Sequence, residues 1–476
     1  MHEDLRRRAL ESGKTVSGKA RSKQSSRESS KANSAANSRA ASRVASRDVS
    51  DDEDDGNGNL SDETTQSINS IDALLESDDF NEQTTDVMRS QVTDAIDHLL
   101  ERKGSSNKSR EANLTTYVRC LTCHYLAEVL YGRVPEVLNA LERSIKAESS
   151  ETETTLALRA AALTAITFEH ERVYETVAPV LKRSISDSQS MPIKAAAIHS
   201  LGICLSFGGA GEDEIAQVMT FLLEIASSDG RFIEADDSPE VVAAAMNTYA
   251  FLATQVEDLE HESEDAVAAF LEQLDAHDVR VQVAAGEAIA LLFEKSYTPR
   301  EDDESSSDED EETTSSDGEP DTSGLVKRYN AYHNPREVLE HVKALASLST
   351  KSMNRRDKKL LHQTFACVVS TVENPKLGLQ TNNASKMVVR VHREGEMRVD
   401  KWWKLMRLNA IRRLLGGGFV NHYFEGNKQV LDALPMIMRA TGEEGMRSPR
   451  RGMGTKATKG RYRDSRRFIS GELLSP

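Results

Sequence analysis

Long apolar runs are missing from this chain of 476 residues. No stretch of about 18 consecutive apolar residues occurs, and a membrane-spanning helix needs roughly that length. The basic start at Arg6 to Arg8 is not followed by the apolar segment of a secretory signal. These absences predict a protein that is neither inserted in a membrane nor secreted, and we expect it in the cytoplasm, the nucleus or both.

Cysteine is also scarce, which excludes a disulfide framework and fits a reducing compartment. The four cysteines are Cys120, Cys123, Cys204 and Cys367. The first two form a CxxCH sequence with His124, the spacing of covalent haem attachment, but they lie in an apolar segment that is typical of a helix facing a core. No second ligand pair follows at zinc spacing. We expect buried thiols here and predict neither a metal nor a cofactor.

The sequence motifs of common enzymes are absent as well. The chain has no HExxH, GxSxG, Walker A or GxGxxG sequence. The glycine clusters at Gly208 and Gly416 lack the preceding strand that a phosphate-binding loop requires, and they predict a turn and a helix cap. His199, His362 and His422 lie in apolar helical settings typical of hydrogen-bonded core histidines. We therefore predict that the protein is not an enzyme and has no small-molecule substrate.

Charge is present in blocks of opposite sign, which the total of −17 conceals. Acidic residues number 14 between Asp48 and Asp86 and 12 between Glu301 and Asp321, and neither tract contains Lys or Arg. Basic residues outnumber acidic ones by 12 to 4 from Met1 to Arg47, by 15 to 5 from Lys351 to Arg413, and by 9 to 2 from Met446 to Pro476. Local basic surfaces suited to a phosphate-rich partner are thus compatible with an acidic total.

Helical periodicity dominates between about residues 84 and 295. Four alanine-rich segments have their anchors at Ala160, Ala195, Ala243 and Ala284, which are 35, 48 and 41 residues apart. Each follows another amphipathic segment, and one helix pair per roughly 40 residues is the spacing of armadillo and HEAT-type arrays. An irregular helical bundle is the alternative that this uneven period leaves open.

Proline and glycine are expected to separate these helices, at Pro179, Pro192, the run from Gly208 to Gly211, and Pro239. After the second acidic tract, helices are predicted to resume at 335–348 and 355–372.

The C-terminal segment has a different pattern. Residues 387–391 predict one short strand, and an apolar stripe containing Trp402 and Trp403 predicts a helix that glycines 416–418 end. Basic residues, with a following histidine and tyrosine, form the candidate surface for a partner or RNA: Arg390, Arg393, Arg398, Lys401, Lys404, Arg407, Arg412, Arg413, His422 and Tyr423. The candidate phosphorylation sites beside charged or proline residues are Ser50, Ser305, Ser306, Ser307 and Ser448.

The predicted domain organisation follows from these patterns. Residues 1–61 form a disordered tail, basic and then acidic, and 441–476 form a disordered basic tail. Residues 62–373 form an all-α, armadillo-like or HEAT-like repeat array interrupted by a disordered acidic insert at 300–323. Residues 384–440 form a small C-terminal helical domain.

Three stretches make the chain similar to the interferon-related developmental regulator family, in a fungal form. The first comprises RDVSDDEDD from Arg47 and AIDHLLERKGSSNKSREANL from Ala95. The second is VPEVLNALERSIKAESSETETTLALRAAAL from Val134. The third is VDKWWKLMRLNAIRRLLGGGFVNHYFEGNKQVLDAL from Val399. The order of these stretches carries the resemblance, and the three charged extensions lie outside it.

The resemblance implies an armadillo-type fold without catalytic activity. It also implies roles in co-regulating transcription and, for some members, in a ribosome association that restrains translation. We accordingly predict a non-catalytic scaffold that regulates gene expression, binding proteins through its repeat surface and a ribosome or RNA through its C-terminal basic region. The alternative is a nuclear adaptor in a transcriptional corepressor complex.

Overall fold

A computed structural model describes most of the chain between residues 82 and 439. The described ranges are 82–101, 104–169, 172–299, 324–347, 353–379, 388–392 and 395–439. The predicted tails at 1–61 and 441–476 and the predicted insert at 300–323 lie outside these ranges.

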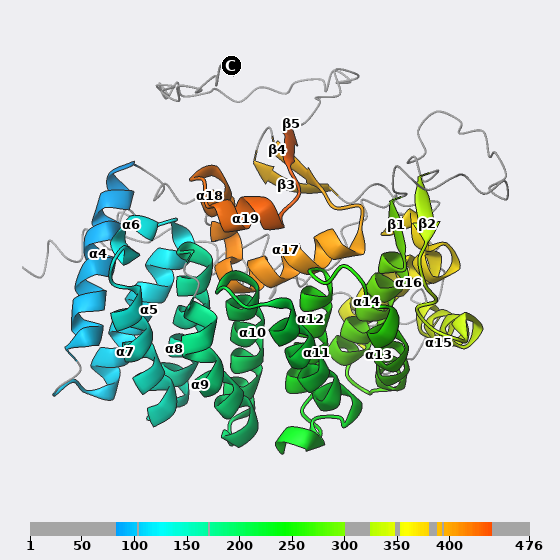
Figure 1. The fold of residues 1–476 in the computed structure, drawn as a ribbon, viewed down its shortest axis with the longest axis horizontal. Helices are drawn as coiled ribbons and strands as arrows, with labels where there is room; N and C mark the ends of the chain where they lie inside the picture. Colours follow the sequence, from blue (N-terminus) through cyan, green and yellow to red (C-terminus); the bar gives the residue numbers. More distant parts are fainter. Residues whose placement is uncertain are drawn as a thin grey trace, which may run out of the picture. The chain divides into compact units, whose positions relative to one another are not determined.

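The described residues before 374 form α-helices that pair in sequence order (Figure 1). The pairs are α4 (Glu82–Leu100) with α5 (Asn107–Cys123), α7 (Val134–Ala147) with α8 (Glu151–Thr167), α9 (Val173–Asp187) with α10 (Met191–Phe207), α11 (Glu212–Ser227) with α12 (Pro239–Ala253), α13 (Glu260–Gln273) with α14 (Val279–Lys295), and α15 (Pro335–Ala346) with α16 (Arg355–Glu373). Two short helices, α6 (Ala127–Leu130) and the 3₁₀ turn η1 (Arg231–Ile233), lie between pairs.

The second helix of each pair packs against the second helix of the next pair. We call this continuous row, formed by α5, α8, α10, α12, α14 and α16, the inner row. Its alanine-rich members pack closely because small side chains let neighbouring helices approach, and Ala160, Ala195, Ala243 and Ala284 are all buried. The predicted helical repeat array is confirmed, and it replaces the irregular bundle that the spacing had left open.

The sequence KSRE at residues 108–111 joins the first pair to the second. Arg110 forms a bidentate ion pair with Glu153 of α8, with nitrogen-to-oxygen distances of 2.8 and 3.0 Å, and Glu153 is fully buried. Glu111 accepts a hydrogen bond from the hydroxyl of Ser150, whose oxygen also caps the first turn of α8 by accepting from the amide of Glu153. One short motif therefore fixes the orientation of two successive repeats.

The prediction that proline separates helices is wrong at one position. Pro179 lies inside α9, where it removes one backbone hydrogen bond but its neighbours Val177 and Val180 are buried against adjacent helices. Pro192 and Pro239 lie in the first turns of α10 and α12, where an amide hydrogen would have no partner within the helix. Tertiary packing outweighs the local cost at Pro179.

A two-stranded antiparallel ladder follows α14. Strand β1 (Tyr297–Pro299) pairs with β2 (Leu325–Lys327), so that Pro299 lies opposite Leu325. The chain then packs Tyr329 and Tyr332 into the core, and the backbone amide of His333 donates to Glu264 of α13 at 2.9 Å. This ladder brings together the two ends of the predicted acidic insert.

The C-terminal segment combines a small sheet with helices. The 3₁₀ turn η2 (Pro375–Leu377) is followed by a sheet in the order β3 (Val388–His392), β4 (Gly395–Arg398) and β5 (Ile437–Arg439). Between β4 and β5 lie α17 (Trp402–Leu415), the 3₁₀ turn η3 (Gly416–Gly418), α18 (Phe419–Phe424) and α19 (Lys428–Ala433). The predicted strand is confirmed as β3. The other two strands were missed because they are only four and three residues long.

Candidate functional site

Helix α17 lies along the inner row (Figure 1), packing against α12 most and against α14, α8 and α5 as well. Its apolar stripe forms the contact, since Trp402, Met406 and Ile411 are buried. The helix ends at Gly416, whose φ of 54° lies in the region that favours glycine. The predicted helix and its glycine cap are therefore confirmed.

A carboxylate from the array holds the first turn of α17. Glu294 of α14 accepts hydrogen bonds from the backbone amides of Trp402 at 3.0 Å and Trp403 at 3.2 Å. The indole nitrogen of Trp402 donates to the hydroxyl of Thr371 on α16 at 2.7 Å. Burial raises the pKa of Glu294 to about 7, although the two amide hydrogen bonds and Lys401 act in the opposite direction. Two orphan amides at the helix start are thus satisfied by a residue about a hundred positions earlier.

An arginine from the array holds the other end. Arg159 of α8 donates from Nη2 to the carbonyl oxygen of Leu414 at 2.6 Å. Burial lowers the pKa of Arg159. A carboxyl group that accepts from the N-terminal amides and a guanidinium that donates to a C-terminal carbonyl both match the polarity of the two ends of α17. The array therefore complements the helix in hydrogen bonding as well as in apolar shape.

Between these two ends, Arg407 fixes the position of α17 against α12. Its guanidinium donates to the hydroxyl of Thr254 at 3.0 Å and to the carbonyl of Thr254 at 2.8 Å. The same group lies 5.1 Å from the centre of the Trp403 ring, a cation–π distance. Burial lowers the pKa of Arg407.

The residues after α17 cover the C-terminal ends of two inner-row helices. Asn421 donates to the carbonyl of Cys123 at 2.8 Å, and Asn427 donates to that of Ile166 at 3.0 Å. The Nε2 atom of His422 lies 2.9 Å from the carbonyl oxygen of Leu121. Carbonyls that α5 and α8 leave without a helical partner thereby acquire one from the C-terminal segment.

His422 is fully buried in this contact. Its Nδ1 atom lies 3.0 Å from the side-chain nitrogen of Asn427, so the neutral ring donates through Nε2 and accepts through Nδ1. Burial lowers the pKa of His422 to about 4, against a raising effect of the Leu121 carbonyl and Glu425. Glu425 also accepts from the backbone amide of Tyr125 at 2.6 Å and lies 2.7 Å from Nδ1 of His124.

The paired helices with a seated C-terminal segment agree with a sequence comparison. Residues 58–373, about two thirds of the chain, match the model of the interferon-related developmental regulator family. The chain belongs to the interferon-related developmental regulator family. The matched residues end at the last residue of α16, so the family match covers the array.

Similar proteins occur in fungi and mammals. An uncharacterized protein of Schizosaccharomyces pombe is 30% identical over 339 residues, which cover 70% of this chain and 71% of that protein. Interferon-related developmental regulator 1 of Sus scrofa is 22% identical over 356 residues, covering 72% of this chain and 70% of that protein. The Homo sapiens protein of the same name is 21% identical over the same length. In general terms, membership of this family makes the chain a regulator of gene expression, and the family and the helical fold together favour a role without catalysis.

Three of the predicted basic surface residues gather near the start of α17. Arg398 lies 3.4 Å and Lys404 lies 2.6 Å from the carboxylate of Asp400. Lys401 donates to the backbone carbonyl of Lys376 at 2.8 Å. All three side chains are half-buried, so each combines a contact within the chain with partial access to solvent. We call Arg398, Lys401, Lys404 and the adjacent Lys376 the basic cluster.

The other predicted surface residues are distributed differently. Arg413 is exposed, whereas Arg412 is buried beside the ring of Phe419, and burial lowers its pKa to about 10. The half-buried Tyr423 accepts through its hydroxyl from the amide of Ile437 at 3.1 Å. Two further residues lack a described side chain: Arg390 belongs to β3, and Arg393 lies outside the described residues, as do the candidate phosphorylation sites Ser50, Ser305, Ser306, Ser307 and Ser448.

The CxxCH sequence is at the end of α5. Cys120 is buried, Cys123 is half-buried, and burial raises the pKa of both thiols. Within the described ranges no group of three or more His, Cys, Asp or Glu residues is placed to hold a metal ion. Among the same residues, no helix is both long enough and apolar enough to span a membrane.

The array-side partners of α17 escaped prediction from the sequence. Glu294 ends the apolar segment VAAGEAIALLFE, and Arg159 begins RAAALTAITFE, so each reads as a polar residue at the end of an alanine-rich helix. Their function depends on a helix more than a hundred residues later in the chain.

Proposed function

We propose that this protein is a non-catalytic scaffold that binds other proteins through its repeat array and associates with ribosomes or RNA through its C-terminal basic region, thereby restraining translation. The observation that carries the proposal is the position of the basic cluster. Asp400 is shared by Arg398 and Lys404, and Lys401 is turned to a backbone carbonyl, so basic side chains exceed the carboxylates that contact them. Such an excess favours phosphate binding.

The seating of α17 supports this function because it makes the basic cluster rigid. Lys401 and Lys404 lie at the helix end that Glu294 and Thr371 hold in place. A fixed set of cations loses little conformational entropy when it meets a phosphate backbone. The first helices of the pairs, α7, α9, α11 and α13, lie outside the inner row, and their surface is the proposed binding site for protein partners.

Sedimentation of the tagged, full-length protein in sucrose gradients tests the ribosome association. We expect co-sedimentation with ribosomes at low salt, loss of it at high salt and a shift after nuclease treatment. A protein that stays at the top of the gradient at low salt contradicts this part of the proposal. The nuclear corepressor alternative remains a separate prediction, and constant exclusion of the protein from the nucleus opposes it.

A triple variant identifies the contact surface. The test variant is Arg398→Gln, Lys401→Gln and Lys404→Gln, and the control variant is Arg143→Gln, Lys146→Gln and Arg183→Gln on α7 and α9. For a single-stranded RNA, each lost phosphate contact lowers the slope of log K against log salt by about 0.7. We expect a reduced slope in the test variant and an unchanged slope in the control. If the test variant has the same slope as the wild-type protein, the basic cluster does not contact the RNA.

A further inference from the structure

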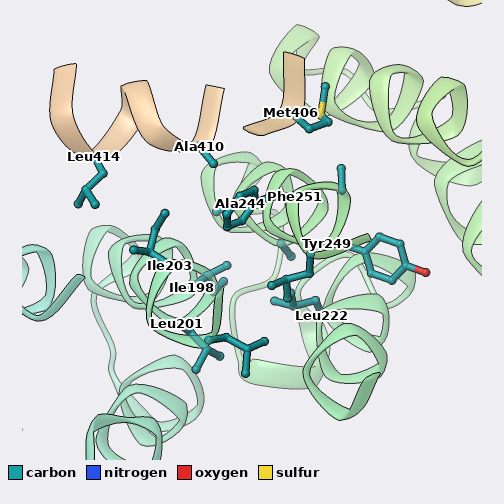
Figure 2. Packing of buried hydrophobic residues seen from close by; sticks show 14 of the residues in the cluster. Ile198, Leu201, Ile203, Leu222, Ala244, Tyr249, Phe251, Met406, Ala410 and Leu414 are labelled. Atoms are coloured by element: carbon teal, nitrogen blue, oxygen red, sulfur yellow. The ribbon is translucent and has the colours of Figure 1, made fainter. Parts of the chain in front are cut away.

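A cavity of about 300 Å³ lies beneath α17. Side chains of α8, α10 and α12 form its floor, and Ala410, Arg413 and Leu414 of α17 form its roof. Figure 2 shows Ala410 and Leu414 facing Ile203 of α10 and Phe251 of α12 across this region. The volume is at the lower end of the range of pockets that bind small molecules.

Small side chains create the space. The lining includes Ala162 of α8, Ala196 and Ser200 of α10, and Ala410 of α17. Helix α17 packs against α8 and α12 but approaches α10, which lies between them, much less. Helix α17 therefore rests on α8 and α12 and passes over α10. The small side chains beneath it leave the space between α17 and α10 unfilled.

The polar groups around the cavity include two guanidinium groups, which are donors only. Arg159, Arg413, Asn247 and His199 line it, and no carboxylate of a described residue does. Arg413 acts electrostatically on the carboxyl group of Glu287, which is outside the lining. Two cations facing a mostly apolar cavity complement a ligand with one negative end.

Two of these groups have unused hydrogen-bonding capacity. The Nε atom of Arg159 is buried and has no acceptor among the described residues, although its Nη2 atom donates to Leu414. Asn247 is half-buried beside the cavity, and its side-chain amide makes no hydrogen bond within the described part of the chain. A buried donor without a partner, such as Nε of Arg159, is costly, so a site that retains one is suited to an acceptor from outside the chain.

We propose that this cavity binds a small organic acid, with its carboxylate between Arg159 and Arg413 and its apolar body against Ile203 and Phe251. Asn247 supplies a further hydrogen bond to the carboxylate. A small molecule fits better than a peptide because α17 itself occupies the inner row above the cavity and leaves no room for an extended main chain. This ligand site is additional to the proposed ribosome association and does not depend on it.

Calorimetric titration of the full-length protein with octanoate, below its micelle concentration, tests the site. We expect saturable binding of one octanoate per chain and much weaker binding of octanol, which has the same apolar body without the charge. Octanol binding as tightly as octanoate would overturn the recognition of an acid, and absence of saturable octanoate binding would overturn the proposal. A peptide with a C-terminal leucine is titrated in the same way. If it binds and octanoate does not, the proposal of a small-molecule site is overturned.

Variants place the ligand. Ala196→Phe fills the cavity and is expected to abolish binding, and Arg413→Gln is expected to weaken it about tenfold through loss of a charge-assisted hydrogen bond. Arg143→Gln, at an exposed arginine on α7, is the matched control and retains full affinity. Thermal melting of each variant checks the fold, and Asn247→Leu is a second test if Ala196→Phe does not fold. Full affinity in folded Arg413→Gln and Asn247→Leu proteins would contradict the site.

Discussion

Glu294 on α14 accepts a hydrogen bond from the backbone amide of Trp402 at 3.0 Å, so a residue of the repeat array serves as the N-terminal cap of the helix that lies on it. A cap of this kind is usually supplied by a residue next to the helix in the sequence. Here the same hydrogen bond caps α17 and holds it on the array. A change that weakens the cap therefore also weakens the packing of α17 on the array.

Replacing this cap should loosen α17. We expect Glu294→Ala to lower the free energy of unfolding by about 2 kcal/mol, because two buried amides lose their acceptor. Denaturant titration gives the change, and limited proteolysis should show earlier cleavage near residue 401. Glu272→Ala, at an exposed glutamate on α13, is the control and should change neither. Equal stability of the Glu294→Ala and wild-type proteins would show that water replaces the carboxylate.

The two tryptophans provide a matched pair. Trp402 is fully buried, whereas Trp403 is half-buried. Trp402→Asp places a charge in the core and should cost about 4 kcal/mol or more, which lowers the melting temperature strongly. Trp403→Asp should cost clearly less, since it mainly removes contacts with Lys404 and Arg407. Similar melting temperatures for the two variants would contradict the described orientation of α17.

His422 predicts a pH dependence. Its pKa is about 4 in the folded protein and about 6.5 in an unfolded chain. Both states are neutral at this residue above pH 7, but between pH 6.5 and 4 the unfolded state takes up the proton, so stability falls as pH falls. When residue 422 is protonated in the unfolded state and neutral in the folded state, this pKa difference lowers the free energy of unfolding by up to about 3 kcal/mol. Glu425 and His124 are the titratable groups that act on it.

The variant His422→Gln isolates this contribution. Other groups titrate in the same range, so the measured quantity is the difference in unfolding free energy between wild type and variant at each pH. We expect this difference to shrink as pH falls from 6.5 to 4, because only the wild type loses the histidine term. A difference that stays constant would show that His422 is protonated in the folded state.

Gly418 should tolerate no side chain. A Cβ atom at this position would lie 1.8 Å from the carbonyl oxygen of Thr122 at the end of α5. Because a backbone atom cannot move away without shifting the helix, Gly418→Ala should lower stability by about 2 kcal/mol or more. The control is Gly324→Ala, whose Cβ would meet nothing within 4 Å. A tolerated alanine at 418 would indicate that η3 lies further from α5.

Periodicity and composition were sufficient to predict the array. The alanine-rich segments around Ala160 and Ala243 carry a local signal, since small and large apolar residues recur at helical spacing within a few turns. The end of α17 was also predictable, because Gly416 follows the last apolar residue of the stripe. The predicted proline boundary at Pro179 failed because burial of neighbouring valines is a property of the packed array and not of the local sequence.

The contacts of the candidate site were not predictable in the same way. The residues that seat α17, Glu294 and Arg159, are distant from it in sequence and resemble ordinary polar helix ends. The sequence predicts that the basic residues of α17 form one surface. In the structure Arg407 is half-buried and Arg412 is buried, whereas Arg413 is exposed. Side-chain burial at such positions depends on which helix lies opposite, and a single sequence does not contain that information.

The ladder of β1 and β2 has a practical consequence. Paired strands lie about 4.8 Å apart, so the chain leaves the array at Pro299 and returns at Leu325 almost at the same point. Additional chain inserted there does not change the distance that α14 and α15 must bridge. The position between these strands is therefore a natural place to graft a fluorescent protein or an affinity label, which would report on the full-length protein while both termini stay unmodified.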